Sequence, residues 1–223
     1  MRYSILLTLA LAATMSVASS AAAPPANQPT PGMIRVRVVT SDGAIVLALD
    51  ARRAPKTTAN FMAYVDDGRF DETKFYRASR RKSDAKSGYI QGGISTDARR
   101  TLPPIPHEPT SMTGIRHVDG TVSMARGRPG SATGNFIITA GLIPSLDARP
   151  DNAGYAAFGH VVAGMDVVRR ILAKPTGGGS GAMKGEMIQP PVRLITVQRL
   201  DGVAKPSTTL KPWLWNLRRR RDN

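Results

Sequence analysis

The sequence predicts a mainly β domain whose sheet closes on itself and is accompanied by two helices. Eight short β-prone runs follow one another between Gly- and Pro-rich turns, whereas only two segments have apolar residues at helical spacing. Many short strands separated by such turns are typical of closed all-β sheets. Beyond the N-terminal segment described below, about 200 residues remain, which suits one domain with its own core.

The first two strands should form a β-hairpin. Residues 34–38 alternate apolar and basic side chains, and residues 44–49 are a second apolar, β-prone run. Ser41, Asp42 and Gly43 lie between the two runs and are residue types favoured in turns. A short turn between two β-prone runs predicts antiparallel pairing.

Two helices are predicted, at 55–67 and 165–172. Pro55 suits a first helical turn and Gly68 closes the segment, while Gly164 precedes the second helix. The apolar residues that share one face are Phe61, Met62 and Val65 in the first helix and Met165, Val168, Ile171 and Leu172 in the second. We expect the first helix to cap one mouth of the strand assembly.

The six remaining strands complete the predicted sheet. They are expected at 74–77, 89–91, 120–125, 135–139, 155–162 and 192–200. Barrels of about eight strands are filled by side chains. A binding site is therefore expected on the outer wall of the sheet and not in its lumen.

The two ends of the chain differ in composition from the domain, which we place at 33–202. Residues 1–23 start with a positive charge, continue with an apolar run and end in small residues, as a cleavable secretory signal peptide does. The apolar run is shorter than the ~20 residues that a membrane span requires. A Pro-rich linker follows at 24–32, and a basic, Trp-containing tail occupies 203–223. We therefore expect a periplasmic protein.

Composition excludes several kinds of site. The sequence has no cysteine, so disulfides, thiolate-bound zinc and a cysteine nucleophile are ruled out. His107, His117 and His160 lack metal-ligand spacing and are expected to be structural or loop residues. The glycine-rich run 177–181 lacks the lysine of a phosphate loop and is expected to be a flexible loop. We expect neither a metal nor a cofactor.

The charge of the chain favours anionic partners. There are 31 Lys and Arg residues against 16 Asp and Glu residues, a formal net charge of +15. Nucleic acid is not an expected partner, because the basic residues are not interleaved with aromatic ones. Trp213 and Trp215 precede four arginines at 218–221. This end could rest on an anionic membrane surface, or the tryptophans could fold onto the domain.

Three fragments resemble a known enzyme family. They are Phe75-Tyr76-Arg77, the run 88–93 that contains Gln91-Gly92-Gly93, and the run 131–136 that ends in Asn135-Phe136. In this order and spacing they resemble the cyclophilin-type peptidyl-prolyl cis-trans isomerases, and the resemblance extends from about residue 35 to residue 200. It implies a closed eight-stranded antiparallel barrel capped by two helices, in a bacterial, exported member that isomerises X-Pro bonds.

The reaction of this family explains why an arginine is needed. Rotation about a peptide C–N bond faces a barrier of about 18–20 kcal/mol, because the nitrogen lone pair is delocalised into the carbonyl. A guanidinium that donates to this nitrogen binds the twisted state more strongly than the planar one. By resemblance, Arg77 takes this role, Gln91 holds the rotating amide on its other side, and Asn135 supplies a second polar contact. No covalent intermediate is implied.

The resemblance also implies an apolar pocket for the proline ring. Matching positions are Tyr89 or Ile90, Met124, Ile137, Leu146 and Tyr155, while Ala125 and Arg126 match the edge where substrate backbone pairs. Each apolar position could instead belong to the core. Ile137 stands where the family usually has an aromatic residue, which predicts an aliphatic floor and low turnover. Residues 78–87 are inserted where the family has a shorter link, and they add four basic residues beside the site.

Two functions follow from these observations. The first is an isomerase that accelerates X-Pro isomerisation during the folding of exported proteins, a step that uncatalysed takes tens to hundreds of seconds. The second is a cyclophilin-like binding module with weak or no turnover, which recognises Pro-containing segments or anionic envelope components. Both functions imply proline-containing polypeptides as partners, and we expect a monomer.

Overall fold

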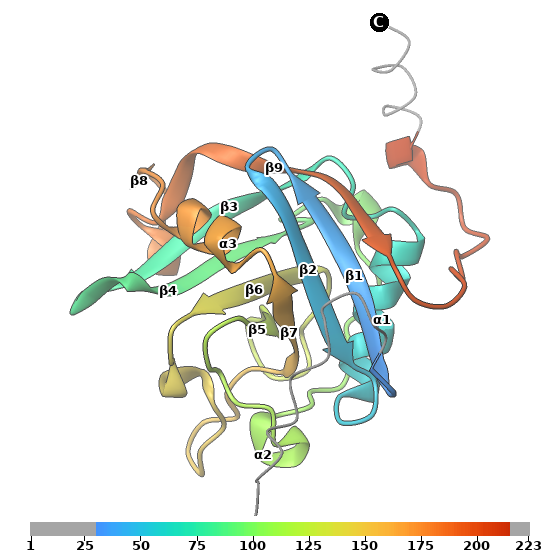
Figure 1. The fold of residues 1–223 in the computed structure, drawn as a ribbon, viewed down its shortest axis with the longest axis horizontal. Coiled ribbons are helices and arrows are strands. Elements are labelled where there is room, and N and C mark those ends of the chain that lie inside the picture. Colours follow the sequence, from blue (N-terminus) through green and yellow to red (C-terminus); the bar gives the residue numbers. More distant parts are fainter. Residues whose placement is uncertain (1–29, 215–223) are drawn as a thin grey trace, which may run out of the picture.

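A single antiparallel sheet closes into a barrel in the computed structural model, which describes residues 30–214 (Figure 1). Its strands are β1 Met33–Thr40, β2 Gly43–Asp50, β3 Thr73–Arg81, β4 Asp84–Gly93, β5 Thr121–Met124, β6 Asn135–Ala140, β7 Ala157–Ala163, β8 Thr176–Gly177 and β9 Met187–Arg199. The strand order is β1-β2-β7-β5-β6-β4-β3-β9-β8, and β1 also pairs with β9. This pairing closes a ring of eight strands and leaves β8 outside it. The predicted barrel is confirmed.

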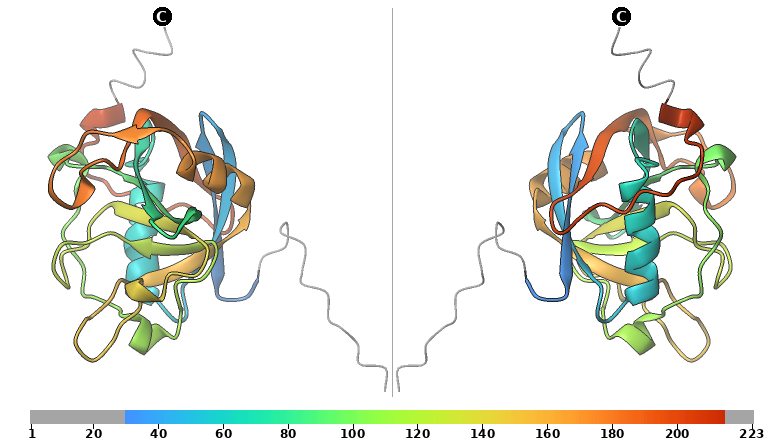
Figure 2. Two further views of the ribbon diagram at one scale, coloured as in Figure 1. Left: turned by 90° about the vertical axis from the view of Figure 1, so that its left-hand side faces the viewer. Right: turned by 90° about the vertical axis from the view of Figure 1, so that its right-hand side faces the viewer.

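The two longer helices lie at different ends of the barrel (Figures 1 and 2). α1 (Pro55–Asp66) comes shortly after the last residue of β2, whereas Val167 of α3 (Met165–Leu172) lies against Gly43, the first residue of β2. Both helices are found where the sequence predicts them. A four-residue helix that was not predicted, α2 (Thr110–Thr113), lies in the connection before β5, and short 3₁₀ turns are found at Ala98–Arg100, Pro144–Leu146 and Gly181–Met183.

The inserted residues 78–87 are part of the sheet. They lengthen β3 and β4 into a hairpin that remains paired out to Arg81 and Asp84 (Figure 1). The predicted strands 74–77 and 89–91 are therefore too short. The strand ends were underestimated because hydrogen bonds between the backbones of neighbouring strands do not depend on apolar side chains, so exposed polar residues can extend a strand.

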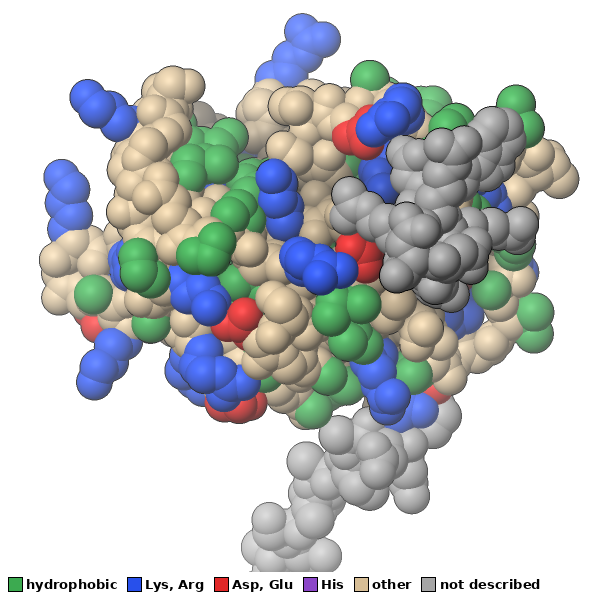
Figure 3. Space-filling model, turned by 90° about the horizontal axis from the view of Figure 1, so that it is seen from above, with side chains coloured by type: hydrophobic (Ala, Val, Ile, Leu, Met, Phe, Trp, Pro, Cys, Tyr) green, Lys and Arg blue, Asp and Glu red, His purple; other side chains and the backbone are tan. Residues whose placement is uncertain are grey.

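The four basic residues of this insertion are not equivalent. The guanidinium groups of Arg80 and Arg81 donate to the carbonyl oxygens of Lys174 and Leu142. Lys82 and Lys86 are exposed near the end of the hairpin. Figure 3 shows Lys and Arg side chains spread over one face of the molecule, with few acidic side chains among them.

The N-terminus of α1 is capped from a distance. Ala54, the residue before the helix, provides no side-chain cap. The buried carboxylate of Glu108 accepts instead from the backbone N–H groups of Lys56 and Thr57, at 3.2 and 2.8 Å, and from the Thr57 hydroxyl at 2.7 Å. A carboxylate at this end also complements the helix dipole. Glu108 thereby ties α1 to the segment that precedes α2.

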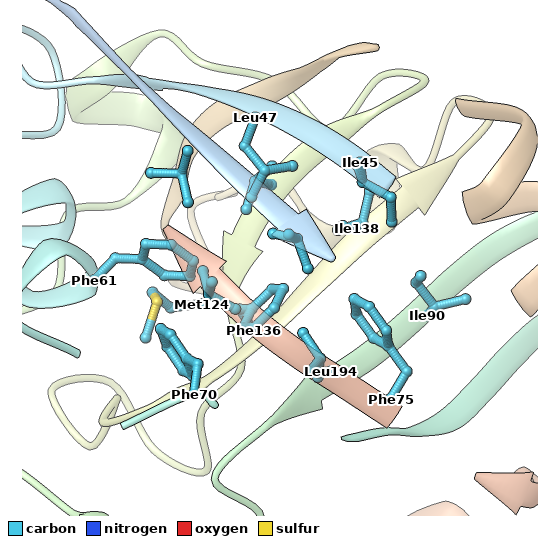
Figure 4. Packing of buried hydrophobic residues seen from close by; sticks show 14 of the residues in the cluster. Ile45, Leu47, Phe61, Phe70, Phe75, Ile90, Met124, Phe136, Ile138 and Leu194 are labelled. Carbon is cyan, nitrogen blue, oxygen red and sulfur yellow. The ribbon is translucent and has the colours of Figure 1, made fainter. Parts of the chain in front are cut away.

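Aromatic side chains fill the barrel. The rings of Phe70, Phe136 and Phe158 surround Phe61, with centroids between 4.9 and 5.3 Å from its own. Figure 4 shows this cluster continuing toward Phe75 along the barrel. Complete burial of one such side chain contributes about 1.5–3 kcal/mol. The lumen is therefore filled, as the sequence predicts, and the outer wall is the remaining surface of the sheet.

The chain after β9 turns back toward the end of α1. The backbone N–H and hydroxyl of Ser207 donate to the Asp67 carboxylate at 2.6 and 2.8 Å, and the Lys211 ammonium lies 3.2 Å from it. The first part of the predicted tail, residues 203–214, therefore packs on the domain.

Trp213 belongs to this returning segment and is buried against the domain. Only 2% of its surface is exposed, and the guanidinium carbon of Arg69 lies 4.5 Å from the centre of its ring. Of the two alternatives for this tryptophan, the structure contains the folded-back one. Trp215 and the arginines at 218–221 lie outside the described residues. Within residues 30–214, no helix is long and apolar enough to cross a membrane.

Candidate active site

A pocket of about 680 Å³ is formed by outward-facing residues of the barrel and the loops beside them. Of the eleven residues predicted for the site, nine line this pocket: Arg77, Gln91, Tyr89, Ala125, Arg126, Asn135, Ile137, Leu146 and Tyr155. They come from β3, β4, β6 and the segments that follow β5 and precede β7. The topology thus brings together positions that are up to 78 residues apart in the sequence.

Arg77 is held at three of its nitrogen atoms. Its Nε donates to the Glu186 carboxylate at 2.7 Å, its Nη1 to the side-chain oxygen of Gln91 at 3.0 Å, and its Nη2 to the carbonyl oxygen of Ala182 at 2.9 Å. The guanidinium also lies over the ring of Tyr89, 5.3 Å from its centre. These contacts fix the orientation of a long side chain that would otherwise be flexible.

Gln91 belongs to a chain of hydrogen bonds behind Arg77. Its Nε2 donates to the Tyr76 hydroxyl at 2.8 Å, and that hydroxyl donates to the Asn135 side chain at 3.2 Å. Asn135 in turn exchanges hydrogen bonds with the backbone of Ser95. Gln91 is buried, and both ends of its amide have protein partners. In this arrangement the Gln91 amide orients the Arg77 guanidinium.

Two tyrosines line the pocket beside cationic groups. Burial raises the pKa of Tyr89, although the charge of Arg77 acts in the opposite direction, so its hydroxyl stays protonated. Tyr155 lies under the Arg126 guanidinium, 4.8 Å from its ring centre, and Arg126 donates to the carbonyl oxygen of Gly154. The predicted edge residue Arg126 is therefore tied to the neighbouring loop.

Two aliphatic side chains line the pocket, and we call them its apolar floor. Ile137 on β6 is buried, and Leu146 is half-buried. Ile137 lies opposite Gln91 in the β4–β6 register, so the apolar floor lies next to the group that orients Arg77. A hydrogen-bond donor beside a shallow apolar surface is the combination that a prolyl bond requires.

Ile90 and Met124 do not line the pocket, and their predicted role is wrong. Both are fully buried in the barrel core (Figure 4). Side chains alternate between the two faces of a strand, and Ile90 stands between the outward-facing Tyr89 and Gln91. Met124 is paired with the core residue Phe136 in the β5–β6 register.

The glycine-rich run 177–181, predicted to be a flexible loop, and the residues that follow it to Met187 form a wall of the pocket. Ala182, Met183 and Met187 line the pocket, and the segment closes on itself through a hydrogen bond from Gly185 to Gly178. Gly178, Gly179, Gly181 and Gly185 all have φ between 53° and 81°, where residues without a side chain are favoured. The glycine content indicated an unusual backbone conformation in this segment. It did not indicate that the segment lies beside Arg77.

Sequence reasoning also missed three residues that form hydrogen bonds with Arg77 or Gln91. Tyr76 entered only as context for Arg77, and neither Glu186 nor Ala182 was selected. Tyr76 could have been found from the strand pattern, because it flanks Arg77 in a β-prone run. Glu186 and Ala182 bind a residue more than 100 positions away, and no local pattern reports such a contact.

His117 is one of the histidines predicted to be structural, and it lies in a buried chain of side chains. Its Nδ1 is 2.7 Å from the Asp147 carboxylate and its Nε2 is 2.9 Å from the Ser123 hydroxyl. Burial lowers the pKa of His117 despite the nearby carboxylate, so the neutral ring donates to Asp147 and accepts from Ser123. Ser123 and His117 are both fully buried and do not line the pocket, which leaves Ser123 without access to a substrate. Within residues 30–214, no group of three or more His, Cys, Asp or Glu side chains could hold a metal ion.

The fold and the pocket together define a closed β-barrel that presents an arginine beside aliphatic side chains on its outer wall. Comparison with known proteins gives the family. The family model described as "Cyclophilin type peptidyl-prolyl cis-trans isomerase/CLD" matches residues 35–198. The chain belongs to this family and is a cyclophilin-type peptidyl-prolyl cis-trans isomerase.

Relatives and solved structures agree with this assignment. A peptidyl-prolyl cis-trans isomerase of Streptomyces antibioticus is 39% identical over 156 residues, which cover 67% of this chain and 89% of the relative. Peptidyl-prolyl cis-trans isomerase A of Dickeya dadantii is 38% identical over 166 residues, 72% of this chain and 82% of the relative. The crystal structure of a Cryptosporidium parvum cyclophilin in the presence of the dipeptide Ala-Pro matches with a TM-score of 0.61 and 19% identity, covering 75% of this chain and 99% of that one. This last likeness shows the fold.

Proposed function

We propose that this protein accelerates X-Pro isomerisation in exported polypeptides, and that Arg77 is the group that lowers the barrier. The observation that supports this most directly is the position of Arg77, fixed on the pocket wall beside the apolar floor made by Ile137 and Leu146. A proline ring on this floor places its nitrogen within reach of a guanidinium N–H. The twisted state, in which the nitrogen lone pair is localised, accepts that hydrogen bond more strongly than the planar state.

The substrate class follows from the reaction and from a solved relative. The Cryptosporidium parvum crystal structure was obtained in the presence of the dipeptide Ala-Pro, and its fold matches this chain. We infer that this protein also binds proline-containing segments, with the ring in the pocket. Lys82 and Lys86 on the long hairpin favour segments with acidic neighbours.

Export is the second part of the proposal. It is supported by residues 1–23, whose charge, apolar run and small residues match a secretory signal peptide. These residues lie outside the part of the chain that the structure describes. Cleavage after residue 21, 22 or 23 would release the linker 24–32 and the barrel into the periplasm.

The catalytic part is tested with a short Ala-Pro peptide. We expect the mature protein to accelerate cis-to-trans isomerisation and Arg77→Ala to lower this rate at least about tenfold, equivalent to about 1.4 kcal/mol in the barrier. Arg77→Lys keeps the charge but loses the planar donor set, and it should also be impaired. Unfolding curves of all three proteins show whether the variants fold. Full activity in a folded Arg77→Ala protein would contradict the proposed role.

The export part is tested separately. The full chain is produced in a Gram-negative host beside a variant that lacks residues 2–23. We expect the full chain in the periplasmic fraction, with a new N-terminus that mass spectrometry places at residue 22, 23 or 24, and the shortened variant in the cytoplasm. Retention of the uncleaved full chain in the cytoplasm would contradict export and would leave the catalytic proposal unaffected.

A binding module with weak turnover is the second candidate function. It is favoured by the ion pair between Arg77 and Glu186, which partly neutralises the guanidinium, and by the aliphatic Ile137 in place of an aromatic floor. This candidate predicts that a Pro-containing peptide binds, as seen by NMR shift changes at the pocket, while its isomerisation rate changes less than about twofold.

A further inference from the structure

Glu186 binds the edge of Arg77 that faces away from Gln91. One carboxylate oxygen accepts from Arg77 Nε at 2.7 Å, and the other accepts from the Ser79 hydroxyl at 2.8 Å. We propose that Glu186 is a positioning residue for the isomerisation, which sets the plane of the Arg77 guanidinium so that its free N–H groups face the proline pocket. The inference rests on the proposed role of Arg77.

The donor inventory of Arg77 shows what is left for a substrate. A guanidinium has five N–H groups, one on Nε and two on each terminal nitrogen. In this structure Nε donates to Glu186, Nη1 to Gln91 and Nη2 to Ala182. One hydrogen therefore remains on each terminal nitrogen. The three protein partners determine the direction of these two hydrogens, because they occupy separate positions around the planar group.

Glu186 is itself fixed by strand β3. Its backbone carbonyl accepts from the Ala78 N–H at 2.9 Å, and its side chain accepts from Arg77 and Ser79. Three successive residues of β3 thus bind this one residue. The glycine turns of segment 177–187 bring it there, so its carboxylate is a preorganised acceptor rather than one that is recruited when substrate binds.

The carboxylate has two opposing effects on catalysis. By fixing the guanidinium it holds the donor within the narrow range of positions that a reaction requires. By its negative charge it weakens the attraction between the guanidinium and the developing lone pair. The two effects are separable, because glutamine keeps an acceptor at Nε without the charge, whereas alanine removes both.

The test measures kcat and KM for cis-to-trans isomerisation of an Ala-Pro peptide. We expect Glu186→Ala to lower kcat about tenfold with a change in KM below about twofold, since orientation acts mainly in the twisted state. Glu186→Gln should recover kcat to within about threefold of the wild type. Ser79→Ala, which loosens Glu186 without touching Arg77, should give an intermediate loss.

A double-mutant cycle shows whether Glu186 acts through Arg77. In an Arg77→Ala background, Glu186→Ala should change the remaining rate by less than about twofold. The matched control is Glu72→Ala, which removes another carboxylate that lies 2.7 Å from an arginine nitrogen, that of Arg193, and should leave kcat unchanged. Unfolding curves of each variant exclude loss of the fold.

The outcomes separate this inference from the proposed function. If Arg77→Ala retains full activity, the role of Arg77 is wrong. If Arg77→Ala is impaired but Glu186→Ala keeps its kcat, only the role of Glu186 is overturned. An equal loss of kcat in Glu186→Ala and Glu186→Gln would also overturn the proposal that Glu186 positions Arg77. A change in KM without a loss of kcat would overturn it as well.

Discussion

Glu186 and Asp67 each form an ion pair with an arginine and connect segments that are distant in sequence, but the burial of the two carboxylates differs. Glu186 binds Arg77 at 2.7 Å with 29% of its side chain exposed. Asp67 binds Arg69 at 2.9 Å with 3% exposed, and it also binds the returning C-terminal segment. Removing one partner of a buried ion pair leaves the other charge without water or a counter-charge, which is costly. In a more exposed ion pair, water can solvate the remaining charge. We therefore expect Asp67 to act on stability and Glu186 on activity.

The environment of Asp67 supports this division. Burial opposes its ionisation, but hydrogen bonds from Ser207, Arg69 and Lys211 outweigh that effect and lower its pKa to about 2. Arg69 is equally enclosed, between Asp67 and the ring of Trp213. One carboxylate thus anchors α1, Arg69 and the segment after β9 together.

The largest effect is expected from Asp67→Ala. This change leaves Arg69 buried without its carboxylate and releases Ser207 and Lys211, so we expect a loss of about 3–5 kcal/mol in the free energy of unfolding. Urea titration followed by tryptophan fluorescence measures it. Isomerase activity well below the transition should stay within about twofold of the wild type. A loss below 1 kcal/mol would show that burial does not distinguish the two carboxylates.

A second, smaller effect is expected from acid. The pKa of Asp67 is about 2 in the folded protein against an ordinary value of 3.8, so the unfolded chain binds the proton more readily. The stabilisation is complete above about pH 4 and is lost as the pH falls toward 2, for a total of about 2 kcal/mol. Urea titrations of the wild type and Asp67→Asn from pH 5 to pH 2 should converge at the acid end. A constant difference in unfolding free energy between the two proteins across this pH range would contradict the lowered pKa of Asp67.

The parts of the fold that follow from local patterns were predictable. The alternation in 34–38 places Val36 and Val38 in the core, and the turn at Gly43 sets the register of the first hairpin. The fragments around Arg77 and Gln91 predicted that the two residues share a site, and both side chains line the same pocket. Such predictions succeed because strand periodicity and turn chemistry act between neighbours in sequence.

The parts that depend on distant contacts were not predictable. Glu186 reaches Arg77 from 109 positions away, and Ser207 reaches Asp67 from 140 positions away. Ile90 was misplaced for a different reason, because the choice between Tyr89 and Ile90 was left to alignment with the family. The period of two along β4, with Gln91 facing outward, would have assigned Ile90 to the core.

Glu108 sharpens the comparison, since it is buried but has no guanidinium partner among its hydrogen bonds. It accepts from Lys56 N–H and from the N–H and hydroxyl of Thr57. We expect Glu108→Ala to cost about 1–2 kcal/mol of unfolding free energy, because α1 loses its N-terminal cap but no buried cation is left behind. Urea titration measures this loss. A cost equal to that of Asp67→Ala would mean that burial alone, without the ion pair, determines the effect.

The smallest effect is expected at Glu72, which matches Glu186 in geometry. Its carboxylate lies 2.7 Å from Arg193, the same separation as between Glu186 and Arg77, but 60% of the Arg193 side chain is exposed. Exposed pairs contribute little because water solvates both charges and salt screens them. We expect Glu72→Gln to change the free energy of unfolding by less than about 0.5 kcal/mol, with no change in kcat. Glu186→Gln should be equally mild in stability, so that activity alone separates the two residues. If Glu72→Gln lowered kcat as much as Glu186→Ala does, removal of a carboxylate outside the pocket would affect the reaction equally. The effect of Glu186 would then have to be attributed to the overall charge of the protein and not to its contact with Arg77.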